Sequence, residues 1–430
     1  MKTDQIQKVH KDWYKLDLSA IVYPTLQRRD FSSVYRLSVL LKEDIDPEIL
    51  QRAVNLTMPR FPTYKAAIRK GVFWRYLEPN DRPGPFVQED VKNPCQPMHF
   101  KGNNRYLVRI YYYRNRIALE AHHSLGDGTG GMCVLQTLTA TYLRLKGHSE
   151  IENGGFVLDI LGIPDPGELE DAYMKYANAK VCPPRPGEKT YRVRGTKEPF
   201  YTLNIIDGIM SVSEVMRVAK SYNATITEYL NSVLLYALMQ KQESEWHLTL
   251  RPVKIAMPVN LRRFFPSRTL RNFITMIYPG IDPGLGEYTF EEIVTQVHNY
   301  MRYYLNEKLL RGDITTNAET QRNPFIRIVP LFIKDLVVRQ FYTKIQDKNS
   351  SAGLTNMGAL KVPETMKPYI ERFDIYMGQP FSTRTNCAIA SFEDILTINF
   401  ASSIAETDVE RLFFRKLVQD GIHVKIESNR

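Results

Sequence analysis

Ala121-His122-His123-Ser124-Leu125-Gly126-Asp127-Gly128 determines the architecture that we expect for this chain of 430 residues. Residues 115–121 lead into it, and their alternating apolar side chains predict a strand. Residues 132–146 follow with apolar side chains at helical spacing, and Gly147 ends the predicted helix. The histidines and the aspartate therefore belong to a glycine-rich turn between a strand and a helix. Such a turn exposes polar side chains on a rigid scaffold, which suits chemistry.

The two histidines are the residues of this turn that can move a proton near neutral pH. Adjacent side chains on an extended segment point to opposite sides, so at most one of His122 and His123 is expected to reach a given reacting atom. An imidazole titrates near pH ~6.5 and can accept a proton from a hydroxyl or an amine. Asp127 is expected either to orient a histidine or to pair with an arginine and hold the turn.

Three other interpretations of the turn compete with a catalytic one. The histidine pair could be an accident of the turn. A metal site is disfavoured because adjacent residues on opposite faces chelate poorly and no third ligand lies nearby in the sequence. Residues 126–131 also satisfy the Gly-x-Gly-x-x-Gly dinucleotide pattern, with Glu150 at the spacing of a ribose ligand. However, Asp127 would then place a negative charge in the pyrophosphate cradle, and the histidines would have no role.

The spacing His-His-x-x-x-Asp-Gly resembles the active-site motif of the coenzyme A-dependent acyltransferase superfamily. This superfamily includes chloramphenicol acetyltransferase, the plant BAHD acyltransferases, bacterial alcohol acetyltransferases and the condensation domains of nonribosomal peptide synthetases. The resemblance implies that His123 is the general base and that His122, Asp127 and Gly128 shape the motif. The plant signature Asp-Phe-Gly-Trp-Gly is absent, so the chain is most similar to the alcohol acetyltransferase and condensation-domain branches.

Two segments of the second half extend this resemblance. Arg262 ends the predicted strand 253–262, and the resemblance pairs it with Asp127. Thr355 and Asn356 belong to a Thr-Asn-Met-Gly segment similar to one at the channel entrance of these proteins. There they could donate hydrogen bonds to a thioester oxygen. From the residues alone, a solvent-facing arginine and a plain Thr-Asn turn explain the two segments equally well.

The composition is that of a globular protein with a basic surface. The net charge is +10, and hydrophobic residues make up 43% of the chain. A basic balance suits the phosphates of coenzyme A or an acidic carrier protein, whereas no dense Lys/Arg cluster indicates a nucleic-acid partner. The four cysteines have no metal-binding spacing. No signal peptide and no apolar run long enough to span a membrane is present, so we expect a cytoplasmic protein with no metal and no tightly bound cofactor.

Periodicity and caps predict the arrangement of elements. We expect strands over 34–41 and 71–76, a helix opening at Asp46-Pro47, and a hairpin over 105–121. Arg60, in a proline-bounded turn, is expected at the surface. The second half contains four capping boxes, at Ser211/Glu214, Thr225/Glu228, Thr289/Glu292 and Thr407/Glu410.

These elements indicate an α+β fold. We place a first domain at 1–180, a Pro/Gly-rich linker at 181–198 and a second domain at 199–430. The resemblance implies that both domains are chloramphenicol acetyltransferase-like and form a pseudo-dimer, with the active site in the channel between them.

The function implied by the resemblance is transfer of an acyl group from acyl-coenzyme A to a small hydroxyl acceptor, with acyl-coenzyme A as co-substrate. His123 would accept the proton of the acceptor, and no serine or cysteine shows the signature of a nucleophile elbow. Two alternatives remain open. An acyl carrier protein could supply the acyl group for transfer to an alcohol or an amine, or the chain could bind acyl thioesters without catalysis.

Overall fold

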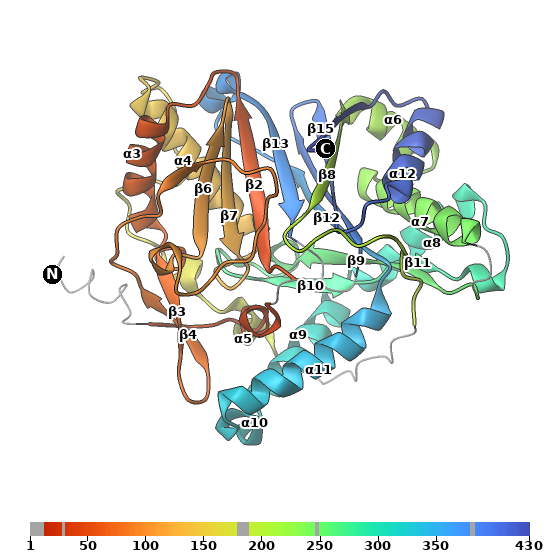
Figure 1. The fold of residues 1–430 in the computed structure, drawn as a ribbon, viewed down its shortest axis with the longest axis horizontal. Coiled ribbons are helices and arrows are strands. Elements are labelled where there is room, and N and C mark those ends of the chain that lie inside the picture. The colour runs from red at the N-terminus through yellow and green to blue at the C-terminus, as the bar shows by residue number, and fades with distance from the viewer. Residues whose placement is uncertain (1–12, 28–30, 179–188, 246–248, 379–382) are drawn as a thin grey trace.

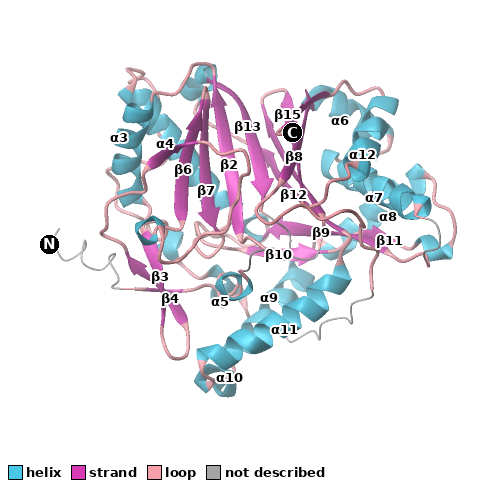
Figure 2. Cartoon of the chain, in the orientation of Figure 1, coloured by secondary structure: helices cyan, strands magenta, loops and turns pink. Residues whose placement is uncertain are grey.

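The computed structural model describes residues 13–27, 31–178, 189–245, 249–378 and 383–430. Two large sheets lie side by side with helices on their outer faces, and a helical arm projects below them (Figures 1 and 2). The mixture of helices and strands agrees with the predicted α+β class. Residues 181–188 of the predicted linker lie outside the described ranges.

The first sheet carries the histidine motif on its central strand. Its strands, in spatial order, are β13 (Ile370–Met377), β2 (Val34–Leu41), β7 (Arg116–His122), β6 (Val108–Tyr113) and β5 (Val87–Glu89). Ile117, Leu119 and Ala121 are buried in the core of this half, which also contains residues of α3 (Pro47–Thr57) and α4 (Gly128–Leu145). The predicted strand 34–41 and the hairpin that delivers the histidines are confirmed. Asp46 caps α3 by accepting hydrogen bonds from the Glu48 and Ile49 amides.

Strand β13 joins the two halves of the chain. It comes from the range 199–430, yet it pairs with β2 in the first sheet, with Met377 opposite Tyr35. Its other side faces the second sheet, where the Ile375 amide donates to Oδ1 of Asn399 at 3.0 Å. The first sheet therefore contains a strand from the far end of the sequence.

The second sheet is built from the later part of the chain. Its strands are β10 (Ile274–Ile277), β9 (Val253–Asn260), β12 (Ala352–Ala359), β14 (Thr385–Phe392), β15 (Ile395–Ser402), β8 (Asn204–Ser211) and β16 (Lys425–Ser428), and β11 (Gly280–Ile281) also pairs with β9. Helices α6 (Val212–Ser221), α7 (Ile226–Ser244), α8 (Phe290–Tyr304) and α12 (Asp408–Gln419) contribute side chains to its core.

The four predicted capping boxes have different outcomes. Those that open α7 and α8, at Thr225 and Thr289, are complete. Ser211 accepts from the Glu214 amide, but the Glu214 carboxylate instead accepts from the amide of His423. The prediction at Thr407 is wrong because its side chain caps nothing. Its expected partner Glu410 is buried and accepts a hydrogen bond from the Thr385 hydroxyl at 3.2 Å.

Near the third sheet, the predicted strand over 71–76 is confirmed only for residues 75 and 76, which belong to β4, and the prediction for Arg60 is wrong. This small sheet contains β1 (Tyr14–Lys15), β4 (Arg75–Pro79) and β3 (Ala66–Lys70), so residues 71–74 form a hairpin turn and not a strand. Arg60 is buried, because its guanidinium donates to both carboxylate oxygens of Glu168 at 2.7 and 2.8 Å.

The remaining helices lie below and between the two sheets. They are α2 (Tyr23–Leu26), α5 (Ala172–Tyr176), α9 (Glu307–Arg322), α10 (Pro324–Ile328) and α11 (Leu331–Asn349). Helices α9 to α11 form the projecting arm.

Candidate active site

His123 follows the last residue of β7 and is held from both halves of the chain. Its backbone amide donates to the Ser33 carbonyl at 2.8 Å, and its carbonyl accepts from Nδ2 of Asn272 at 2.9 Å. Its ring is stacked on Tyr23, with centroids 4.8 Å apart, and lies against Tyr35 at 4.6 Å. The two tyrosines fix the plane of the imidazole.

The surroundings of His123 keep its ring neutral. Burial lowers the pKa of His123 to about 4, and the nearby Asp127 only partly opposes this. Nδ1 is buried and has no hydrogen-bond partner among the described residues. The imidazole is therefore unprotonated at neutral pH, which is the state that accepts a proton.

His122 has different surroundings. It is fully buried, its Nδ1 accepts a hydrogen bond from the Ser124 amide at 3.2 Å, and its ring meets Phe100 edge-on. Burial lowers the pKa of His122 to about 3. Through the Ser124 amide, His122 supports the turn that carries its neighbour.

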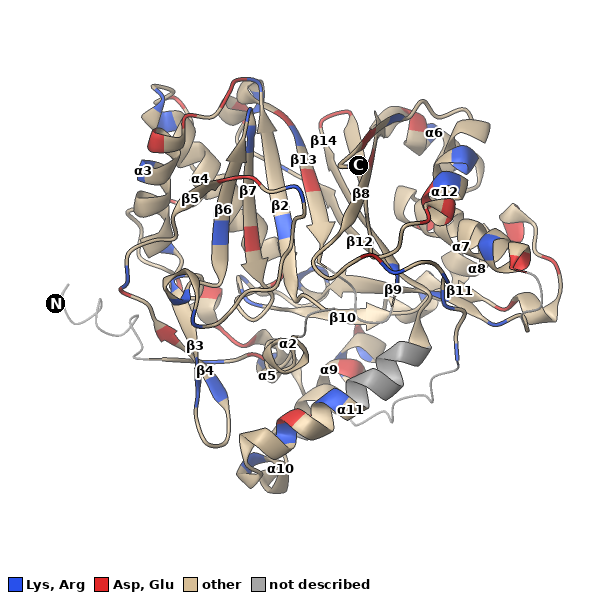
Figure 3. Ribbon diagram, in the orientation of Figure 1, with Lys and Arg blue, Asp and Glu red and all other residues tan. Residues whose placement is uncertain are grey.

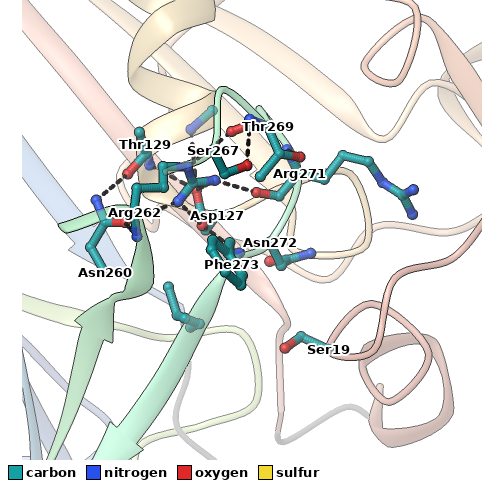
Figure 4. Close-up of polar contacts among 12 residues, drawn as sticks. Ser19, Asp127, Thr129, Asn260, Arg262, Ser267, Thr269, Arg271, Asn272 and Phe273 are labelled. Atoms are coloured by element: carbon teal, nitrogen blue, oxygen red, sulfur yellow. Dashed lines mark hydrogen bonds and ion pairs between the residues drawn. The ribbon is translucent and has the colours of Figure 1, made fainter. Parts of the chain in front are cut away.

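Asp127 is the N-cap of α4 and the partner of Arg262 (Figure 4). Oδ1 accepts from the amides of Thr129 and Gly130, and Oδ2 accepts from the Phe273 amide at 2.9 Å. Nη1 of Arg262 reaches Oδ2 at 2.8 Å, and Nη2 reaches Oδ1 at 3.3 Å. The solvent-facing interpretation of Arg262 is therefore wrong. These donors fix the Asp127 carboxylate in place, and through it they hold the loop in its conformation.

The segment 269–273 carries the second half of the chain onto this loop. Arg262 donates to the carbonyls of Thr269 and Arg271, which shapes the segment. Asn272 also donates to the buried Asp17 carboxylate, with Nδ2 3.1 Å from Oδ2. The N-terminal segment, the histidine loop and the segment 269–273 thus form one hydrogen-bonded unit.

Glycines make this close approach possible. A Cβ atom at Gly130 would lie 1.9 Å from the Leu270 carbonyl oxygen, and one at Gly126 would lie 2.4 Å from the same atom. At Gly131 a Cβ would lie 2.6 Å from the Tyr35 hydroxyl. Because protein atoms fill the space beside these glycines, the loop has no open cradle for a pyrophosphate. The dinucleotide interpretation is therefore disfavoured.

Thr355 and Asn356 lie on β12, and the next residue of this strand, Met357, lies against the histidine loop at Gly128. A Cβ at Gly128 would lie 2.9 Å from Sδ of Met357. Asn356 donates to the Thr227 hydroxyl at 2.9 Å and accepts from the Gly358 amide at 2.7 Å. No hydrogen bond in the described structure joins Thr355 or Asn356 to His123, so their role as oxyanion donors stays a prediction.

Three residues of the candidate site had no role in the sequence prediction: Tyr23 and Tyr35, which contact the His123 ring, and Asp17, which bonds to Asn272. Tyr35 lies on the strand predicted over 34–41, and its pairing opposite Ala121 places it beside the motif. Only the pairing register of two strands far apart in the sequence reveals this position. No local signal marks Tyr23 or Asp17.

The described part of the chain contains no group of three or more His, Cys, Asp or Glu side chains placed to hold a metal ion. Cys95, Cys133 and Cys387 are free and buried, while Cys182 lies outside the described residues. Among the described helices, none is long and apolar enough to cross a membrane.

Comparison with known proteins supports the fold. No protein-family model and no curated protein sequence matches the chain. Among solved structures, TRI101 from Fusarium sporotrichioides, complexed with coenzyme A and T-2, is 12% identical with a TM-score of 0.62, over 98% of this chain and 100% of that one. The trichothecene 15-O-acetyltransferase TRI3 from the same organism is 12% identical with a TM-score of 0.59, over 95% and 94%.

A condensation domain gives a similar match. The starter condensation domain of rhizomide synthetase, a variant in complex with C8-CoA and Leu-SNAC, is 10% identical with a TM-score of 0.59, over 97% of this chain and 96% of that one. The likeness spans nearly the full length of both chains in all three cases. The chain therefore has the fold shared by these acyltransferases and condensation domains.

Proposed function

We propose that this protein transfers an acyl group from acyl-coenzyme A to a hydroxyl acceptor, in the manner of alcohol O-acetyltransferases. The observation that carries the proposal is the position of the His123 imidazole, which is held between two tyrosines where the two halves of the chain meet. We also propose that residues 1–180 and 199–430 form a pseudo-dimer of chloramphenicol acetyltransferase-like domains, with the substrate channel between them.

In the proposed mechanism His123 is the general base. Because Nδ1 is buried, Nε2 is the nitrogen that would accept the proton of the acceptor hydroxyl. The acceptor oxygen attacks the thioester carbonyl, and negative charge develops on the carbonyl oxygen. When the tetrahedral intermediate collapses, the carbon–sulfur bond breaks and His123 returns the proton to the departing thiolate.

The attack is proposed to be direct, without an acyl-enzyme. Burial raises the pKa of Cys133 to about 12 and also raises the pKa values of Cys95 and Cys387. These thiols are therefore protonated at neutral pH and are poor nucleophiles. Asp127 and Arg262 are positioning residues because their contacts hold the loop. Thr355 and Asn356 are proposed to line the channel and to stabilise the charged oxygen.

The test is release of free thiol from a panel of acyl-coenzyme A donors, with and without alcohol and amine acceptors. Acceptor-dependent release should fall by about a hundredfold to ten-thousandfold in His123→Ala. His423→Ala is the matched control because that side chain is 93% exposed and remote from the loop in sequence. Equal rates in wild type and His123→Ala would overturn the proposed base.

The same assay separates the donor alternatives. The net charge of +10 suits the phosphates of coenzyme A, but it also suits an acidic carrier protein. Turnover with carrier-bound thioesters alone would replace the coenzyme A donor by a carrier protein. Tight binding of acyl-coenzyme A with no turnover from any donor would favour the non-catalytic function.

A further inference from the structure

The first part of helix α11 presents apolar side chains to solvent. Phe332, Ile333, Leu336 and Val337 follow helical spacing and are 74%, 41%, 59% and 60% exposed. The charged residues between them, Lys334 and Asp335, are instead half-buried against the body of the protein. A surface helix of a globular protein normally has the opposite orientation, with its apolar stripe toward the core.

Two neighbouring segments extend this apolar surface. Helix α10 and the turn between β3 and β4 pack beside the start of α11, where the Leu331 amide donates to the Val72 carbonyl at 2.8 Å. Lys334 donates to the carbonyls of Phe73 and Arg327 and so ties the three segments together. We call this surface the apolar end; it consists of Val72, Phe73, Trp74, Phe325, Ile326, Ile328, Phe332, Ile333, Leu336 and Val337, all of which are exposed.

Ion pairing fixes the orientation of α11. Both carboxylate oxygens of Asp335 accept from the guanidinium of the buried Arg75, at 2.8 and 2.6 Å. The Thr25 hydroxyl also donates to Asp335 at 2.8 Å, and Nε of Arg339 donates to the Thr25 carbonyl at 2.9 Å. Turning the apolar side inward would break the Arg75–Asp335 ion pair and leave the buried Arg75 guanidinium without its carboxylate, which is costly. The exposed apolar side is therefore built into the fold.

The charges around the apolar end are mostly positive (Figure 3). Residues 69–78 and 322–339 contain seven Lys or Arg side chains and two acidic ones. The two acidic side chains pair with two of the seven basic ones, Glu78 with Arg69 and Asp335 with the buried Arg75, which leaves an excess of five basic side chains. An apolar surface with exposed aromatic side chains and surrounding basic residues is typical of proteins that bind at the interface of an anionic membrane.

We propose that the apolar end docks on the surface of an anionic lipid bilayer, with the apolar side chains in the interfacial region and the basic side chains against the lipid headgroups. A symmetric contact with a second copy is disfavoured because it would bring two surfaces of the same positive charge together. The turn between β3 and β4, α10 and the start of α11 all lie at the lower edge of the molecule, away from the two large sheets (Figure 1).

Helix α2 connects the apolar end to the candidate active site. Thr25, which contacts Asp335 and Arg339, lies two residues after Tyr23, whose ring is stacked on His123. Docking would therefore take place next to the element that covers one face of the imidazole.

The test is flotation with vesicles of phosphatidylcholine alone or mixed with phosphatidylglycerol. Wild type should float with the anionic vesicles, and binding should weaken as salt is raised. The double variant Phe332→Ser/Leu336→Ser should lower the vesicle partition coefficient by about tenfold or more, because two large apolar side chains are removed. The control Leu161→Ser/Leu285→Ser removes side chains that are 88% and 80% exposed elsewhere and should bind like wild type.

Several outcomes would overturn the proposal. Wild type could fail to float with anionic vesicles, or the two double variants could bind equally well. A dimer in sedimentation equilibrium that is lost only in Phe332→Ser/Leu336→Ser would assign the surface to a second copy. Circular dichroism spectra establish that each variant is folded. The readout is binding, so it is independent of whether the protein transfers acyl groups.

Discussion

At His123, desolvation and not a charged partner sets the basicity of the side chain. The cost of placing a positive charge in this environment lowers the pKa of His123 to about 4. The two flanking tyrosines pack against the ring and orient it.

The pH profile of the reaction tests this environment. Because the pKa is lowered, the base form of His123 persists to lower pH than that of a free histidine. We expect kcat/KM for acyl transfer to be level from about pH 8 to about pH 6 and to fall only as the pH approaches the pKa of about 4. Initial rates and circular dichroism at each pH provide the measurement and its control. A fall in kcat/KM centred near pH ~6.5 would contradict the expectation.

The Asp127–Arg262 pair carries the second prediction at the residue scale. Arg262→Ala leaves the largely buried Asp127 carboxylate without its cation, so the free energy of unfolding should fall by about 3 kcal/mol or more. Arg262→Lys keeps the positive charge but loses the bidentate contact with Asp127, so the free energy of unfolding should fall by less than in Arg262→Ala. Urea unfolding measures both variants, and the exposed neighbour Arg263→Ala is the control. Equal losses in Arg262→Ala and Arg263→Ala would show that the pair contributes nothing.

At the scale of elements, the start of α4 is shaped by what packs on it. Gly130 and Gly131 lie in the first turn of the helix, where helix propensity favours other residues. They are needed because the segment 269–273 and Tyr35 approach the helix backbone directly. The glycines of the motif therefore serve a contact between the two halves of the chain.

The variant Gly130→Ala tests whether helix propensity or tertiary packing has the larger effect on stability at this position. Propensity alone would stabilise the helix by about 1 kcal/mol, whereas the Cβ would clash with the Leu270 carbonyl oxygen. We expect a net loss of about 2 kcal/mol in the free energy of unfolding, because backbone and not a flexible side chain must move. Thermal and urea unfolding measure the change. Gly102→Ala, where a Cβ meets only ordinary contacts at 3.5 Å or more, should behave like wild type. Stabilisation by Gly130→Ala would contradict the packing argument.

At the scale of the whole molecule, a buried polar network joins the two sheets. Asn399 on β15 donates to Asp207 at 2.8 Å and accepts from the Ile375 amide of β13. The Tyr376 hydroxyl donates to the other oxygen of Asp207 at 2.9 Å. Because β13 belongs to the first sheet, these bonds couple the stability of one half to the other.

Asn399→Ala tests this coupling. The substitution leaves the Ile375 amide and an oxygen of Asp207 without these partners, which should cost about 3 kcal/mol. Both sheets should then lose protection together. Hydrogen exchange, measured by mass spectrometry on peptides from β7 and from β15, reports on each sheet separately. Faster exchange in β15 with unchanged exchange in β7 would mean that the halves are energetically independent.

The sequence by itself determined the local structure around the candidate site. The alternation over 115–121, the helical spacing after Gly131 and the capping boxes at Thr225 and Thr289 depend on residues a few positions apart, so they could be predicted. The strand and the turn that carry His123, and the α+β class, follow from such local patterns. The pairing of Arg262 with Asp127 came from the resemblance to acyltransferases, and the structure confirms it.

Only the tertiary structure decided the surroundings of these elements. The tyrosines around His123, the position of β13 in the first sheet and the burial of Arg60 all depend on strand register and on contacts between distant segments. The failed cap at Thr407 has the same origin, because Glu410 is drawn into the core by Thr385. Likewise, the sequence of α11 cannot show that its apolar side faces outward. An ion pair with a residue 260 positions away sets that orientation, and no local pattern contains such information.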